Sequence, residues 1–219
     1  MSSKETLINQ WRAHNVDSDI LEAFLTVPRE HFVIDSEMKQ YAYDDNPLPT
    51  LRKQSLSQPT TVIMMLQALQ VKQGHRVFEV GSGAGYNATL LAELVGKDGY
   101  VVTTEVIPEL VAVSRRKMEE LDYSNFTVFE TDGSEGYLQQ APYDRIIITA
   151  ACPSFPQPLI DQLKDEGIIL APIGDPEKQQ LVKGTKKNGK LSLEFLGPFC
   201  FVPMIGKLGF KEIELPNKR

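Results

Sequence analysis

Cysteine and histidine are scarce in this chain of 219 residues. Cys152 and Cys200 stand far apart and form no C-x-x-C pair, which excludes a disulfide framework and a zinc-ribbon site. We therefore expect two free thiols, both buried as small residues, in a reducing compartment. The three histidines, His14, His31 and His75, lie outside the glycine-rich and serine-containing motifs, so we expect them in structural or surface roles and expect no metal site.

Long apolar runs and a basic excess are also absent. No stretch approaches the roughly 18 apolar residues of a membrane span, and the N-terminal region lacks the apolar core of a signal peptide. Lys and Arg number 23 against 29 Asp and Glu, giving a formal charge of −6. Proteins that bind a nucleic-acid backbone normally carry a basic face. The sequence predicts a cytoplasmic protein without membrane or nucleic-acid partners.

From residue 76 onward, short β-rich runs alternate with helical patterns. This alternation is typical of a doubly wound α/β fold, in which helices cover both faces of a mostly parallel sheet. In the helix expected near residues 108–121, Lys117 is predicted to face solvent. After residue 174 two strands flank Asn188-Gly189, a pair typical of a type I′ hairpin with its lysines solvated at the tip. The sheet is therefore expected to end in an antiparallel pair.

Residues 1–75 show no strand-helix repeat. Helices are expected at residues 4–13, 17–27 and 60–70, with a loop-rich stretch between the second and the third. We predict one domain over residues 1–219, in which residues 1–75 form a helical cap over the carboxyl edge of the sheet. Residues 76–219 then form the α/β core, and open α/β folds bind ligands at that edge.

A glycine-rich loop follows the first strand of the core. Gly81, Ser82, Gly83 and Gly85 stand at a strand-to-helix turn, where glycine allows the backbone to approach a ligand closely. A dinucleotide fingerprint reads G-x-G-x-x-G, whereas the sixth position counted from Gly81 is Tyr86. The loop also lacks the Lys-Ser/Thr of a P-loop. Neither a dinucleotide nor a triphosphate is therefore favoured.

Three acids surround this loop in the sequence. Glu79 precedes it, and Glu105 ends the second strand, where an acid can accept both hydroxyls of a ribose. Asp132 and Gly133 follow the third strand, where an adenine edge could rest. Each acid alone could be a helix cap or a surface charge, but together they favour a cationic ligand over a phosphate. The sequence predicts a site for a cationic adenosyl compound, and S-adenosylmethionine is the leading candidate.

The chain resembles the protein-L-isoaspartate O-methyltransferase family over nearly its whole length. The loop EVGSGAGY is similar to motif I of S-adenosylmethionine-dependent methyltransferases, and further matches are VPREHFV, AYDDNPLP, SLSQP, TTEVIPEL, TDGSEG, TAACPSFPQP and FVPMIGKLGF. The resemblance implies a Rossmann-like, seven-stranded methyltransferase sheet with an antiparallel last strand. One departure is Leu51-Arg52-Lys53-Gln54, just before SLSQP, where the family usually has a segment that contains glycine. This departure puts the peptide preference of the chain in doubt more than its chemistry.

The resemblance also implies roles for individual residues. Ser57 corresponds to the active-site serine; a cap for the helix near residue 60 is its alternative role. Gln58, Ala151 and Val202 fall near the position of the damaged peptide. By motif position Glu79, Gly81, Ser82, Gly83 and Gly85 line the methionine side, Glu105 the ribose, and Asp132 with Gly133 the adenine.

The implied reaction is methylation of the α-carboxylate of L-isoaspartyl residues in damaged proteins by a monomeric enzyme that needs no metal. Whether D-aspartyl residues are accepted stays open. Two alternatives remain: methylation of aspartates in a dedicated peptide, or an RNA methyltransferase or inactive cofactor-binding module of the same fold. The acidic balance weakens the RNA alternative.

Overall fold

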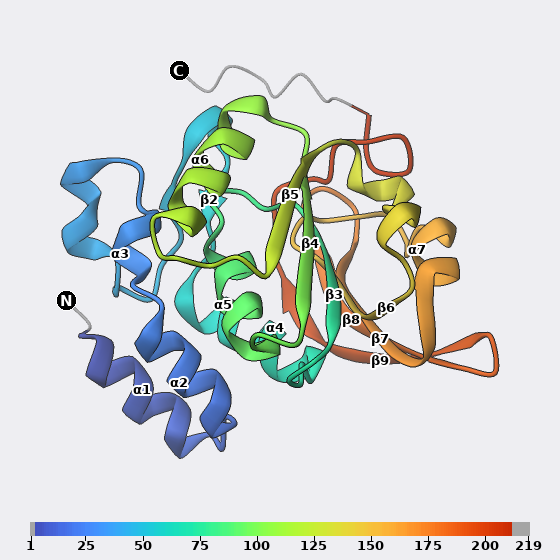
Figure 1. Cartoon of the computed structure of the whole chain (residues 1–219), viewed down its shortest axis with the longest axis horizontal. Helices are drawn as coiled ribbons and strands as arrows, with labels where there is room; N and C mark the ends of the chain where they lie inside the picture. The colour runs from blue at the N-terminus through green and yellow to red at the C-terminus, as the bar shows by residue number, and fades with distance from the viewer. Residues whose placement is uncertain (1–2, 212–219) are drawn as a thin grey trace.

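A seven-stranded sheet forms the centre of the computed structural model, which describes residues 3–211 (Figure 1). The strand order is β5-β4-β3-β6-β7-β8-β9. The strands are β3 (Arg76–Val80), β4 (Tyr100–Glu105), β5 (Phe126–Glu130), β6 (Tyr143–Ile148), β7 (Leu163–Gly174), β8 (Gln179–Lys187) and β9 (Lys190–Phe199). The first five are parallel, and β8 is antiparallel to β7 and to β9. The predicted sheet and its antiparallel ending are confirmed.

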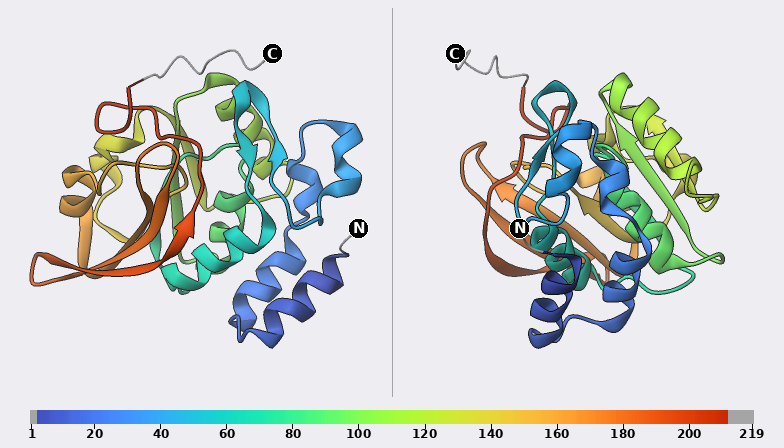
Figure 2. Two further views of the ribbon diagram at one scale, coloured as in Figure 1. Left: turned by 180° about the vertical axis from the view of Figure 1, so that it is seen from behind. Right: turned by 90° about the vertical axis from the view of Figure 1, so that its left-hand side faces the viewer.

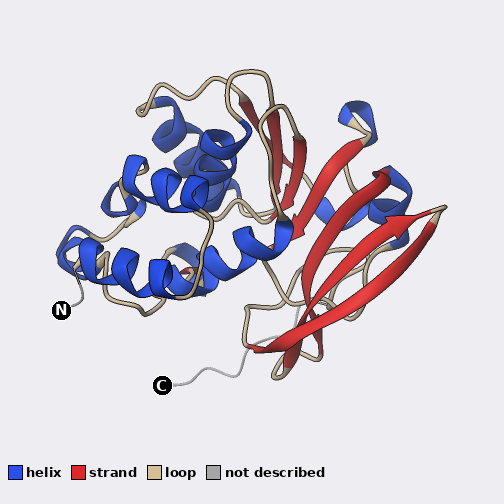
Figure 3. Ribbon diagram, turned by 90° about the horizontal axis from the view of Figure 1, so that it is seen from below, coloured by secondary structure: helices blue, strands red, loops and turns tan. Residues whose placement is uncertain are grey.

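Helices cover both faces of the sheet, unequally (Figure 3). Val77 and Phe78 are neighbours on β3, and their side chains enter two different apolar clusters on opposite faces. The larger cluster contains residues of α4 (Pro59–Leu69), α5 (Tyr86–Val95) and α6 (Pro108–Glu119). The smaller cluster contains Leu159 of α7 (Gln157–Gln162), and the short turn η3 (Gly133–Glu135), which η4 (Leu138–Gln140) follows in the chain, contacts α7. The doubly wound arrangement is therefore present, with most of the helices on one face.

The N-terminal region differs from the predicted cap. Helices α1 (Lys4–Ala13) and α2 (Ser18–Thr26) lie beside α4, at the opposite end of the molecule from residues 201–211 (Figure 2). Their buried side chains, such as Trp11 and Phe24, join the larger apolar cluster. Apolar helix faces need an apolar partner, and the layer formed by α4 and α5 provides one. The prediction that residues 1–75 cover the carboxyl edge was wrong for these two helices.

The later part of this region does reach the carboxyl edge. It contains α3 (Arg29–Phe32), η1 (Ser36–Tyr41), β1 (Leu48–Pro49), η2 (Leu51–Lys53) and β2 (Ser55–Leu56). Strands β1 and β2 form a small antiparallel sheet that was not predicted. Helix α4 packs on β6 and β7 and so belongs to the layers of the core. Within residues 3–211, no helix combines the length and apolar character needed to cross a membrane.

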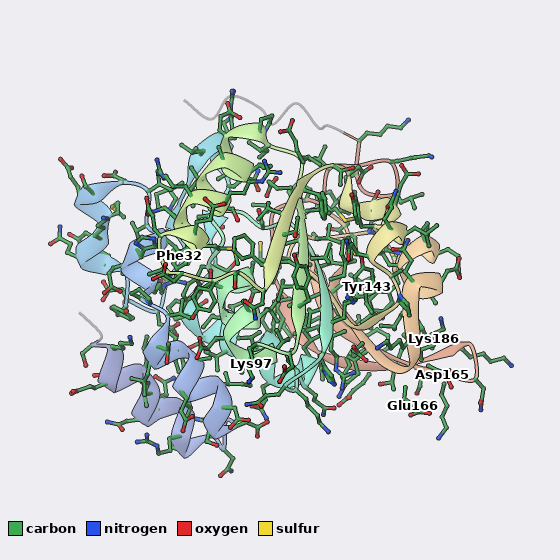
Figure 4. The ribbon with its side chains drawn as sticks, viewed as in Figure 1. Phe32, Lys97, Tyr143, Asp165, Glu166 and Lys186 are labelled. Atoms are coloured by element: carbon green, nitrogen blue, oxygen red, sulfur yellow. The ribbon has the colours of Figure 1, made fainter. Side chains whose placement is uncertain are left out.

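Three predicted side-chain environments were wrong. Cys200 is exposed, whereas Cys152 is buried as predicted. Lys117 is buried because its stem packs inward while its ammonium donates to the carbonyl of His31 on α3. Lys186, expected at a solvated tip, is half-buried instead and donates to the carbonyls of Ile160 and Leu163 at 2.7 Å each (Figure 4). Long lysine side chains satisfied backbone carbonyls in both cases.

The Lys186 contacts give a stability prediction. Lys186→Met should lower the free energy of unfolding by about 1–2 kcal/mol, because two charge-assisted hydrogen bonds to the end of α7 are lost. The matched control is Lys187→Met, which alters an exposed lysine of the same hairpin and should change stability by less than about 0.5 kcal/mol. Urea unfolding measures both. Equal effects of the two substitutions would show that the Lys186 contacts contribute nothing.

Candidate functional site

A cavity of about 680 Å³ lies at the carboxyl ends of β3 and β4. This is within the usual size range of small-ligand sites, and its place next to the reversal of strand order at β3 is where open α/β sheets bind ligands. Its wall comes from segments far apart in the sequence. The main ones are residues 52–57, 80–84, 86–87, 104–109, 149–150 and 201–205, together with Thr131 and Gly133.

The glycine-rich loop turns its backbone donors toward the protein. The N–H groups of Gly81 and Ser82 both donate to the carbonyl of Thr104, at 2.9 and 3.0 Å. Gly85 N–H donates to the Ser82 carbonyl at 2.8 Å. Gly81, Gly83 and Gly85 all have positive φ, and at Gly85 an added Cβ would also lie 2.9 Å from Ser114 Oγ. A phosphate-binding loop directs such donors at its ligand, so this loop is shaped for a different ligand.

Glu105 joins this loop to the end of β4. Its Oε2 accepts the N–H of Gly83 at 3.0 Å, and its Oε1 accepts those of Val106 and Ile107 at 2.9 and 3.1 Å. The carboxylate lines the cavity and is largely buried. Burial raises its pKa, and the three backbone donors oppose that shift. Each carboxylate oxygen can accept more than one hydrogen bond, so Glu105 retains capacity for a ligand.

Glu79 lies beneath the loop and does not line the cavity. Its side chain is fully buried, and it accepts hydrogen bonds from Asn87 Nδ2 at 2.7 Å and Thr103 Oγ1 at 2.5 Å. Burial raises the pKa of Glu79 to about 7; the two hydrogen bonds oppose the shift, and the charge of Glu105 adds to it. Asn87 does line the cavity. Glu79 is therefore in indirect contact with the cavity through Asn87.

Asp132 is occupied by the backbone on both carboxylate oxygens. Its Oδ1 accepts Ser134 N–H at 2.9 Å, and its Oδ2 accepts Lys207 N–H at 2.6 Å. Asp132 thus connects the turn after β5 to Lys207, which follows the segment of residues 201–205 that lines the cavity. The neighbouring Gly133 lines the cavity, and a Cβ there would collide with Thr104 and Val80. The adenine region predicted from this pair therefore has Gly133 at its surface and Asp132 behind it.

The four residues predicted near the acceptor lie in three segments. Ser57 and Val202 line the cavity, whereas Gln58 and Ala151 do not. Ala151 N–H donates to Val202 O, and Met204 N–H donates to Ala151 O, each at 2.8 Å. The N-cap residue of α4 is Gln58, so the alternative role of Ser57 as that cap was wrong. Ser57 is therefore available to a ligand.

Some residues at the site carried no sequence-based prediction. Tyr86 lines the cavity with its hydroxyl buried. Arg52 lines the cavity and forms an ion pair with Glu109 of α6, which lines it too. Arg29 is fully buried behind Ser57. Arginine is rarely buried, so the sequence gives no reason to expect Arg29 in the interior. Its motif, VPREHFV, supports the family resemblance but does not indicate which groups Arg29 contacts.

The seven-stranded sheet with antiparallel final strands and a cavity at the ends of β3 and β4 matches the Rossmann-like fold of a solved methyltransferase. The sequence model of the protein-L-isoaspartate(D-aspartate) O-methyltransferase family matches residues 2–209. The chain therefore belongs to this family of S-adenosylmethionine-dependent enzymes.

Individual relatives agree with this assignment. The protein-L-isoaspartate O-methyltransferase of Methanococcoides burtonii is 41% identical over 93% of this chain and 100% of its own length. That of Methanothrix thermoacetophila is 43% identical over 95% of this chain and 98% of its own. A solved structure of a protein-L-isoaspartate O-methyltransferase has a TM-score of 0.88 at 29% identity, covering 94% of this chain and 67% of that one.

The buried Glu79 makes stability depend on pH. Its pKa is raised from 4.5 to about 7 in the folded protein, so the folded state holds this proton more tightly than the unfolded state does. The free energy of unfolding should therefore fall as pH rises from about 4.5 to about 7 and then level off. Glu79→Gln removes this decline, so the variant should gain about 3 kcal/mol relative to the parent across that window.

Urea unfolding at several pH values, without cofactor, tests this expectation. Glu22→Gln, which alters an exposed acid of α2, is the control and should follow the parent at every pH. Parallel pH profiles for the parent and Glu79→Gln would contradict the assignment of a raised pKa to Glu79.

Proposed function

We propose that this chain transfers a methyl group from S-adenosylmethionine to the α-carboxylate of L-isoaspartyl residues in damaged proteins, which starts their repair through a succinimide. One observation carries the proposal: a single cavity brings the loop of motif I and Glu105 together with Ser57 and Val202. The first pair provides for the methyl donor and the second for the acceptor. Family membership supports both halves.

The residues present fit S-adenosylmethionine. Glu105, with acceptor capacity remaining at the cavity surface, would accept the ribose hydroxyls. Gly81, Ser82, Gly83 and Gly85 would shape the methionine side, and Glu79 would act there through Asn87. Gly133 would contact the adenine, with Asp132 holding the turn in place. The carboxylate of Glu105 at the cavity wall favours a cation there, and the sulfonium supplies an electrophilic methyl group when the cofactor is bound.

The acceptor needs no strong base from the protein. A carboxylic acid has a reference pKa near 4, so the isoaspartyl group is already an ionised nucleophile at pH 7. One of its oxygens bonds to the methyl carbon as the carbon–sulfur bond breaks, and the electron pair stays on sulfur to give S-adenosylhomocysteine. What remains for the protein is to align the reacting atoms and exclude water.

Ser57 is the proposed catalytic residue, because its hydroxyl would position the acceptor carboxylate. Val202 would contact the peptide, and Gln58 would flank it next to Ser57. Ala151 would hold the segment around Val202 and Met204 through its two backbone hydrogen bonds. The methyl ester then has a better leaving group than the carboxylate, so the adjacent backbone nitrogen closes a succinimide without the enzyme, and hydrolysis returns some normal aspartate.

The proposal includes the remaining expectations from the sequence. The chain would act as one domain over residues 1–219, as a cytoplasmic monomer without metal and without nucleic-acid or membrane partners. Residues 1–2 and 212–219 of that domain lie outside the described residues. A second candidate function, methylation of aspartates in a dedicated peptide, is favoured only by Arg52 and Lys53, which stand in the cavity wall where the lead-in departs from the family.

A paired peptide assay tests the proposed function. Purified protein with methyl-labelled S-adenosylmethionine should label an isoaspartyl peptide at least about 100-fold faster than its aspartyl twin, because only the former has a free α-carboxylate. In the aspartyl twin the α-carboxyl group is part of the peptide bond. Several unrelated isoaspartyl sequences should all be methylated. Equal labelling of the twins, or activity confined to one peptide sequence with normal aspartate, would contradict the proposal and favour the dedicated-peptide alternative.

A further inference from the structure

Arg29 is fully buried on α3 and connects two loops behind the cavity. Its Nε donates to the carbonyl of Ala42 at 2.8 Å, and its Nη2 donates to the carbonyl of Ser57 at 2.6 Å. The planar guanidinium thereby fixes the distance between the two carbonyls, since its donors are held in a rigid fork. The backbone of Ser57 is held from behind while the residue itself lines the cavity.

The charge of Arg29 has no carboxylate partner in the described part of the chain. Asp45 is near enough to attract the guanidinium electrostatically, but its carboxylate accepts hydrogen bonds from Thr60 N and Oγ1, at 2.9 and 2.7 Å. Burial lowers the pKa of Arg29, and the neighbouring side chain of Tyr86 opposes that shift. The Tyr86 ring centroid lies 5.0 Å from the guanidinium carbon. Arg29 is thus a buried cation held by backbone carbonyls and an aromatic face.

Stability alone does not account for such a residue. Burying a cation without an anion is costly, and an apolar side chain of similar size is often equally stable or better. Arg145 offers a comparison, because it is also largely buried and donates to backbone carbonyls, those of Gln70 at 3.1 Å and Asp144 at 2.8 Å. Neither Arg145 nor these two acceptors lines the cavity. The difference is that one acceptor of Arg29 is the proposed catalytic serine.

We infer that Arg29 is a positioning residue for methyl transfer: its guanidinium fork, joining the carbonyls of Ala42 and Ser57, sets the place of Ser57 against the acceptor carboxylate. This inference rests on the proposed function. A lysine at position 29 keeps the charge but has no fork, so it cannot hold both carbonyls in the same geometry. A displacement of the aligned groups by about 1 Å can lower the rate of a reaction 100-fold.

The test compares Arg29→Lys with Arg145→Lys in the isoaspartyl peptide assay. The concentration of active sites is measured from the amount of labelled cofactor bound at saturation, and kcat is calculated per active site. A smaller folded fraction therefore does not lower kcat. Arg29→Lys should lower kcat about 10- to 100-fold, in the same direction as Ser57→Ala. The KM for the peptide should change less than about threefold and the Kd for S-adenosylhomocysteine less than about twofold, since Arg29 does not line the cavity. Arg145→Lys should leave all three constants unchanged.

Arg29→Met provides a second test if Arg29→Lys does not fold, because it removes the charge that is costly to bury. It should lower kcat at least as much, again with cofactor affinity retained. The inference is overturned if the Arg29 variants keep the parent kcat, or if Arg145→Lys lowers kcat equally. An inactive parent protein would instead contradict the proposed function, so the two failures are distinguishable.

Discussion

The three hydrogen bonds accepted by Glu105 hold the site together. The carboxylate takes the N–H groups of Gly83, Val106 and Ile107, and so fixes the glycine-rich loop against the end of β4. With the donors of Gly81 and Ser82 directed at Thr104, the loop presents few N–H groups to a ligand, and the acid at the end of β4, Glu105, lines the cavity. This arrangement of the backbone supports the proposed binding of a cationic adenosyl group and does not favour a pyrophosphate.

The acceptor side depends on segments that do not belong to the sheet. Ser57 comes from the N-terminal region, and Val202 comes from the segment after β9, which Ala151 and Asp132 bind at two places. Buried Arg29 ties the first of these segments to the turn at Ala42. The strand ends of the sheet thus line one part of the cavity, and flanking segments, including Arg52 and Lys53, line the other.

The sequence predicted the central sheet and several segments that line the cavity, but neither the position of α1 and α2 nor the small β1–β2 sheet. Strand-helix alternation predicted the parallel sheet, and Asn188-Gly189 predicted the final hairpin, because both signals are local. The environments of Lys117 and Lys186 and the contacts of Arg29 were missed, since each depends on a contact between distant segments. The exposure of Cys200 was also missed. The sequence also did not predict that Glu79 lies outside the cavity wall. A motif gives the order of its residues, but it does not show which of them the loop covers in the folded protein.

The proposed function requires that this loop bind a sulfonium-bearing adenosyl ligand and reject a dinucleotide. Calorimetric titration of the purified chain with S-adenosylmethionine and, separately, with NAD measures this selection directly. We expect saturable binding of S-adenosylmethionine at one molecule per chain, and no detectable heat with NAD at concentrations about 100 times higher. Binding of NAD with an affinity within tenfold of that for S-adenosylmethionine would contradict the account.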